Sequence, residues 1–224
     1  MSSLNTIEKI GYTLVLGVTI AGAITALISE QLFMDNFTVE DGLVETATAI
    51  FLLLGGLMMA WRAFTLRSGK TAWFLVTSLF ISLLFIFVGG EELSWGQRIF
   101  EVESSEFFKE NNAQAETNLH NLVVGDVKLN KLIFGKLLTA ALFIYTLLFP
   151  LFYKRSAFFK KWIDYFYIPV PKVHQSAVFV ISSLIIALLD VSRKWEVLEF
   201  GTSIVFFLVL YSPMNAFIYE KKDA

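Results

Sequence analysis

The sequence predicts an all-α, polytopic membrane protein with about six transmembrane helices and short interfacial helices. Three observations predict this fold class. Apolar residue types make up 56% of the 224 residues and charged types only 17%, whereas soluble domains are nearer a quarter charged. Six apolar stretches approach the roughly 20 residues that a helix needs to cross a bilayer. The connections between these stretches alternate between basic and acidic character, so we expect one membrane domain over residues 1–224.

Each predicted span follows from apolar length. The six spans are 10–33, 42–61, 71–90, 132–153, 173–191 and 196–219. The first is longer than the apolar region of a cleaved signal peptide. It ends in Ser29-Glu30-Gln31 without a small-x-small cleavage pattern, so we expect a retained helix. The fifth is the shortest.

The basic residues predict the orientation of the spans. Most of the 18 Lys and Arg residues lie near Lys9, in 62–70, in 154–172 and at the C-terminus. The positive-inside rule assigns these stretches to the cytoplasm. Both termini are then cytoplasmic, which an even number of spans requires. Most acidic residues lie on the opposite, extracytoplasmic side.

Two connections are expected to hold interfacial helices. The extracytoplasmic connection 91–131 is long for a structureless loop, and Phe100, Phe107 and Phe108 are suited to anchoring short helices on the membrane surface. On the cytoplasmic side, 156–172 mixes aromatic residues with lysines and ends at Pro169 and Pro171. It therefore also predicts an interfacial helix.

The candidate site residues are ionisable groups at the extracytoplasmic membrane boundary. Glu45 and Glu199 lie about one turn inside their predicted helices, where an ionised group is costly. Glu91 and Glu92 follow Gly89-Gly90 and precede Trp95, Gln97 and Arg98. His120 lies in Asn118-Leu119-His120-Asn121. Like charges this close repel each other, so a metal, a proton or a basic group such as Arg98 should offset them.

Two roles are predicted for these residues. Glu91, Glu92, His120 and Arg98 form the candidate catalytic set, in which a glutamate would act as general base. Glu45, Glu92, His120 and Glu199 form a candidate site for a divalent metal ion. The absence of Cys excludes thiol catalysis and thiolate metal sites. There is no H-E-x-x-H, G-x-S-x-G or P-loop motif, and no signature of nucleic-acid binding.

Two stretches carry a resemblance to a known group of proteins. Residues 90–98, Gly-Glu-Glu-Leu-Ser-Trp-Gly-Gln-Arg, are followed by Asn-Leu-His-Asn at 118–121. Together they resemble uncharacterised bacterial multi-pass membrane proteins that carry GEE-[I/L]-SWGQ and a later NLHN. The resemblance implies the bacterial cytoplasmic (inner) membrane and no particular activity. A more distant similarity is to the CPBP intramembrane proteases, but Arg98 here lies six positions after Glu92 rather than four.

Three functions are compatible with the sequence. One is a membrane-embedded, metal-dependent hydrolase or transferase that acts at the extracytoplasmic face on a lipid, lipid-linked or peptide substrate. Another is an ion- or proton-coupled transporter that uses Glu45, Asp190 and Glu199. The last is a non-catalytic scaffold or assembly subunit. We favour the first, because polar residues from three separate hairpins converge on one face; the sequence leaves the oligomeric state open.

Overall fold

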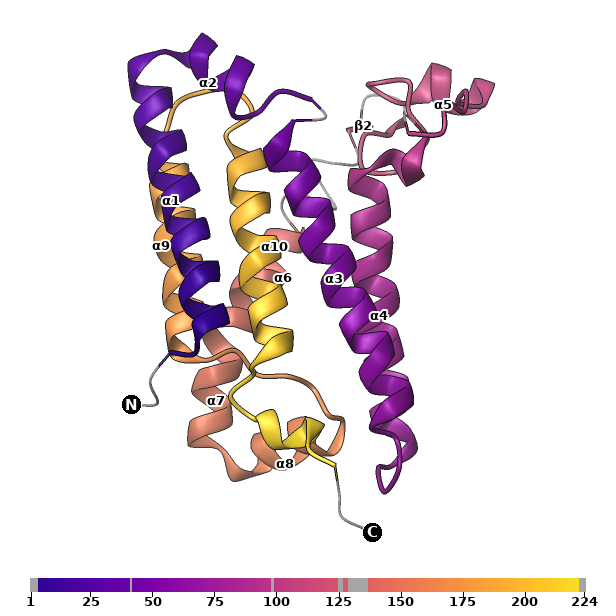
Figure 1. Cartoon of the computed structure of the whole chain (residues 1–224), viewed down its shortest axis with the longest axis vertical. Helices are drawn as coiled ribbons and strands as arrows, with labels where there is room; N and C mark the ends of the chain where they lie inside the picture. Colours follow the sequence, from indigo (N-terminus) through magenta and orange to yellow (C-terminus); the bar gives the residue numbers. More distant parts are fainter. Residues whose placement is uncertain (1–3, 41, 98, 125–126, 129–136, 222–224) are drawn as a thin grey trace.

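The computed structural model describes residues 4–40, 42–97, 99–124, 127–128 and 137–221, and most of them are helical (Figure 1). The long helices run along the long axis of the molecule. They are α1 (Thr6–Ile28), α3 (Leu43–Thr65), α4 (Ala72–Glu92), α9 (Val173–Ala187) and α10 (Trp195–Tyr211). Helix α10 packs against α1, α3 and α9, while α4 packs along α3. The bundle is therefore centred on α10.

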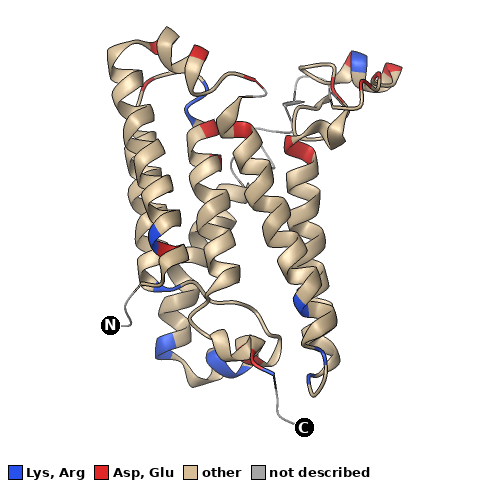
Figure 2. Cartoon of the chain, viewed as in Figure 1, with Lys and Arg blue, Asp and Glu red and all other residues tan. Residues whose placement is uncertain are grey.

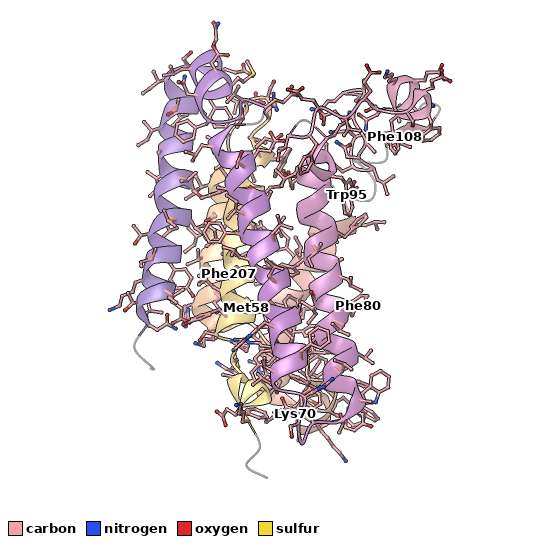
Figure 3. The ribbon with its side chains drawn as sticks, turned by 45° about the vertical axis from the view of Figure 1, so that its right-hand side comes forward. Met58, Lys70, Phe80, Trp95, Phe108 and Phe207 are labelled. Atoms are coloured by element: carbon pink, nitrogen blue, oxygen red, sulfur yellow. The ribbon has the colours of Figure 1, made fainter. Side chains whose placement is uncertain are left out.

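Three of these helices, α1, α3 and α4, are long and apolar enough to cross a membrane. They correspond to the predicted spans 10–33, 42–61 and 71–90, and they support a membrane protein. Helix α9 is a shorter apolar helix. Large apolar side chains lie exposed on the long helices, as expected for surfaces that face lipid; Phe80, Leu83 and Leu57 are each more than half exposed. Phe80 points away from the bundle in Figure 3.

Three predicted spans end or break at different places in the structure. Helix α1 stops at Ile28, because Ser29 is extended and its side chain caps the next helix, α2 (Glu30–Asn36). Helix α10 stops at Tyr211, because the residue before Pro213 disfavours helical geometry. The predicted span 196–219 therefore comprises α10, a turn and a short 3-10 helix, η4 (Ala216–Tyr219).

The predicted span 132–153 is also interrupted. Its first part, 132–136, lies outside the described residues. The remainder consists of α6 (Leu138–Phe143), a π-helical turn, η3 (Ile144–Leu148), and α7 (Phe149–Arg155). Pro150 has no N–H to donate to the carbonyl of Thr146. That carbonyl accepts from Ser176 Oγ of α9 instead, at 2.6 Å, so the turn lets the chain continue past the proline.

Small residues allow α3 and α4 to lie close together. Ser82 Oγ donates to the carbonyl of Gly56 at 2.8 Å. A Cβ on Gly56 would lie only 2.7 Å from Ile86 Cγ1. Close approach through small residues with a hydrogen bond between helices is typical of packing inside membranes.

The two ends of the bundle differ in charge. Figure 2 shows most acidic residues at the end where α3 begins and α4 finishes, and most basic residues at the opposite end. We call these the acidic end and the basic end. The described part of the chain begins with α1 and ends after η4, both at the basic end (Figure 1). There, Arg62 donates to the carbonyls of Leu210 and Tyr211, and Lys172 bonds to Glu8 and Ser212.

The connections contain the expected short helices. Residues 91–131 include a 3-10 turn, η1 (Ser94–Gly96), and helix α5 (Glu106–Asn111). They also include two antiparallel strands of two residues each, β1 (Val123–Val124) and β2 (Val127–Lys128). Phe100 and Phe107 are exposed, whereas Phe108 is half-buried. Helix α8 (Ala157–Tyr165) occupies the second predicted segment.

Candidate functional site

Glu91 and Glu92 are the last residues of α4, and their side chains have different neighbours. Successive helical residues differ by about 100° in direction. The side chain of Glu91 therefore meets the connection that follows α4. The electrostatic neighbours of Glu92 include Glu45 of α3 and Glu196 of α10.

Glu91 is a buried hydrogen-bond acceptor, only 3% exposed. Its Oε1 accepts from the indole Nε1 of Trp95 at 2.7 Å. Its Oε2 accepts from the backbone N–H groups of Leu119 and His120, at 2.6 and 3.1 Å. Charged acceptors make hydrogen bonds about twice as strong as neutral ones. Glu91 thus attaches the Asn-Leu-His-Asn stretch to the end of α4.

The turn after α4 has unusual backbone geometry. Ser94, Trp95 and Gly96 have φ values of 45°, 56° and 78°, in the left-handed region that non-glycine residues seldom adopt. This turn folds the indole of Trp95 back over Gly90. A Cβ at Gly90 would lie 2.9 Å from the Trp95 ring, so the glycine makes room for the indole that donates to Glu91.

Polar side chains hold residues 112–121 against this turn, and we call that segment the docked loop. Ser94 Oγ donates to Glu116 at 2.5 Å and accepts from Asn118 Nδ2 at 2.8 Å. Asn112 Nδ2 donates to the backbone and side-chain oxygens of Asn118. Gln97 accepts from the backbone N–H of Thr117 at 2.7 Å. The two stretches that carried the family resemblance therefore bind each other.

A second set of acids lies on the side of α4 that faces the bundle. Glu45, Glu92, Glu196 and Glu199 interact electrostatically with one another, and we call them the carboxylate group. They come from the ends of α3, α4 and α10. Glu199 is exposed, and the other three are half-buried. Glu45, Glu92 and Glu199, three members of the predicted metal set, are thus electrostatic neighbours from three helices.

Part of the negative charge is offset by Arg193, just before α10. Its guanidinium lies 3.9 Å from Glu196 and 3.7 Å from Glu40. Glu40 also accepts from Gln114 Nε2 of the docked loop at 2.6 Å. The docked loop and the carboxylate group are therefore linked through Glu40.

His120 lies with the docked loop. Its electrostatic neighbours are Glu91 and Glu116, whereas those of Glu92 are Glu196, Glu45 and Glu91. Burial lowers the pKa of the His120 imidazole below its ordinary value, and the two carboxylates oppose that effect. His120 is therefore an electrostatic neighbour of Glu91, whose carboxylate also accepts from the His120 backbone N–H.

The predicted metal set, Glu45, Glu92, His120 and Glu199, does not form a metal site in the part of the chain that the structure describes. Within the described ranges, no group of three or more His, Asp or Glu side chains is placed to hold a metal ion. Glu45, Glu92 and Glu199 are electrostatic neighbours of one another, and the acids that act on His120 include Glu91 and Glu116. The candidate catalytic residue Arg98 lies outside the described residues.

Comparisons with known proteins give no relative from which to transfer an activity. No protein-family model, curated protein or solved structure matches this chain.

Several residues of the site were not in the predicted set. Glu196 joins the carboxylate group, and its i, i+3 spacing from Glu199 could have indicated this. Ser94, Glu116 and Asn118 hold the docked loop. Their contacts depend on the left-handed turn at 94–96, which no periodic pattern in the sequence indicates.

Proposed function

We propose that this chain is a six-span protein of the bacterial cytoplasmic membrane with both termini in the cytoplasm. Three helices that could cross a membrane support a membrane protein. The described part of the chain begins and ends at the basic end (Figures 1 and 2), which the positive-inside rule assigns to the cytoplasm. In this topology α6–α7, α9 and α10 supply the other spans, and the acidic end faces outward.

We further propose a hydrolase or transferase that acts at the outer face on a lipid, lipid-linked or peptide substrate. The observation that carries this proposal is the different use of two adjacent acids. Glu91 is occupied by three donors, which leaves Glu92 as the α4 acid among carboxylates from two other helices. Closely placed carboxylates share protons, and such a group can accept a proton from a nucleophile and return it to a leaving group.

The distribution of ionisable groups favours this function over an ion- or proton-coupled transporter. A relay across the membrane needs ionisable groups along the path. Along the described helices α3, α4 and α10, the first ionised side chain beyond the carboxylate group is Arg62. That guanidinium donates to α10 carbonyls and lies over the ring of Tyr219 at 4.1 Å. The acid–base chemistry is therefore confined to one end.

Isotope incorporation tests the proposal. The full chain, reconstituted in vesicles of bacterial lipid extract with lipid-linked sugars and membrane peptides, would be incubated in ¹⁸O-labelled water. Products would be analysed by mass spectrometry. A hydrolase places ¹⁸O in a product, whereas a transferase forms a new adduct without the label. We expect Glu92→Gln to lower the rate by about 10²-fold or more, as for loss of a general base.

The matched control is Glu106→Gln, which removes an acid of α5 that is outside the carboxylate group. This variant should retain the wild-type rate. The proposal is wrong if the wild-type protein converts none of these substrates. It is also wrong if Glu92→Gln and the wild-type protein give equal rates.

A further inference from the structure

Helix α8 has one face that packs on the protein and one that does not. Ile163 is buried with Tyr153 and Val170, and Phe159 packs on Phe149 with ring centroids 5.3 Å apart. The opposite face carries Phe158, Lys161, Trp162 and Tyr165, at helical spacings of three and four residues. All four are exposed.

This second face presents unused polar groups beside aromatic surface. Lys161, Trp162 and Tyr165 line an open pocket. Among the described residues, Lys161 Nζ, Trp162 Nε1 and Tyr165 Oη have no hydrogen-bond partner. These three groups can therefore donate to an oxygen-rich ligand without breaking a contact within the chain.

The neighbouring lysine shows why this face differs from the rest of the helix. Lys160 Nζ donates to Asp164 Oδ2 at 2.7 Å and to the hydroxyl of Tyr153 at 2.5 Å, so its charge is paired. Lys154 and Arg155, at the end of α7, are exposed like Lys161. The charge on this surface is therefore positive, and an anionic ligand would complement it.

A row of aromatic rings indicates the position of this surface relative to the membrane interface. Trp162 stacks on Phe166 at 5.7 Å, and Phe166 contacts Trp73 at 4.8 Å. Trp73 is in the first turn of α4, which is long and apolar enough to span a membrane. Tryptophan and tyrosine concentrate at membrane interfaces, where one side of the ring is apolar and the other is wet.

We propose that the exposed face of α8 binds anionic phospholipid headgroups at the bilayer surface. The phosphate would accept from Lys161, Trp162 and Tyr165, while Lys154 and Arg155 would supply further positive charge and Phe158 would enter the acyl boundary. Basic residues beside aromatic anchors are typical of helices that lie in the interface. This binding does not depend on any reaction at the acidic end.

The absence of Cys makes a site-specific test possible. Phe158→Cys, labelled with a fluorophore, would be reconstituted as the full chain in phosphatidylcholine vesicles. A fixed fraction of brominated phosphatidylglycerol or brominated phosphatidylcholine would then be included to quench the label. We expect the quenching to show that brominated phosphatidylglycerol has about fivefold higher affinity for the labelled site than brominated phosphatidylcholine. One basic residue at an anionic surface changes binding by a factor of that order.

Charge removal identifies the residues responsible. In the same labelled background, Lys161→Gln combined with Lys154→Gln and Arg155→Gln should bring the two lipids to equal quenching. Lys109→Gln, which removes a lysine of α5, is the matched control and should keep the preference. Absence of quenching by either lipid would overturn the proposal, because α8 would then lie away from the bilayer. Equal quenching in the parent protein, or a preference that survives the triple substitution, would also overturn it.

Discussion

Replacing Glu91 with alanine should release the docked loop from the end of α4. The substitution leaves three donors without their acceptor: the indole N–H of Trp95 and the backbone N–H groups of Leu119 and His120. Each such hydrogen bond contributes about 1 kcal/mol net. The three together give a loss of about 3 kcal/mol, which is roughly a 100-fold change in the equilibrium between docked and open loop.

Hydrogen–deuterium exchange of the purified protein measures this equilibrium directly. Peptides that cover 112–122 should exchange up to roughly 100-fold faster in Glu91→Ala, while peptides from α3 should be unchanged. Glu92→Ala is the matched control. It removes a carboxylate from the next position, and none of those three donors bonds to it. Unchanged exchange in Glu91→Ala, or equal acceleration in both variants, would refute the role assigned to Glu91.

Three further predictions concern packing, ion pairing and pH. Gly90→Ala should lower the stability of the fold by about 1–3 kcal/mol, because the new Cβ would overlap the indole ring of Trp95. Gly17→Ala is the control and should leave the stability unchanged, because nothing lies within 4 Å of its Cβ. Equal melting temperatures of the two variants would contradict this prediction. Lys172→Met should destabilise the fold by about 3–5 kcal/mol, because it leaves the carboxylate of Glu8, which is 2% exposed, as an unpaired buried charge. In chemical unfolding, the double variant Lys172→Met/Glu8→Gln should recover part of that loss. The lowered pKa of His120 means that the folded chain binds fewer protons than the unfolded chain below about pH 6.5. The protection of the docked loop from hydrogen exchange should therefore be constant above that pH and decline as the pH falls through it. His120→Asn should remove this component of the pH dependence.

The positions of the helices followed largely from apolar length, and their exact ends did not. The stretch 71–90 matches α4, because nothing within it interrupts an apolar helix. The predicted span 196–219 was too long because Pro213, which ends α10 at Tyr211, lay inside an otherwise apolar run. The break after Ile28 depends on Ser29 capping α2, and that is a local hydrogen bond rather than a composition signal.

The location of the candidate site could be predicted from the sequence, but the different neighbours of Glu91 and Glu92 could not. The sequence placed Glu45, Glu92 and Glu199 at the same membrane boundary, and in the structure they are electrostatic neighbours. Helical geometry predicts that Glu91 and Glu92 point in different directions, but it could not indicate which groups each of them meets. The turn that follows α4 has positive φ angles at Ser94 and Trp95, and its Ser94 bonds to Glu116 and Asn118, more than 20 positions away in the chain. Such long-range contacts cannot be read from spacing.

The bond between Arg62 and the last turn of α10 has a mechanical consequence. Because the guanidinium bonds carbonyls of Leu210 and Tyr211, the helix pair α3–α4 is fastened to α10 at the basic end. At the other end the same helices carry carboxylates that repel one another when ionised. The same three helices are therefore fastened together by hydrogen bonds at the basic end and carry mutually repelling groups at the acidic end, so the acidic end is where they would separate most easily.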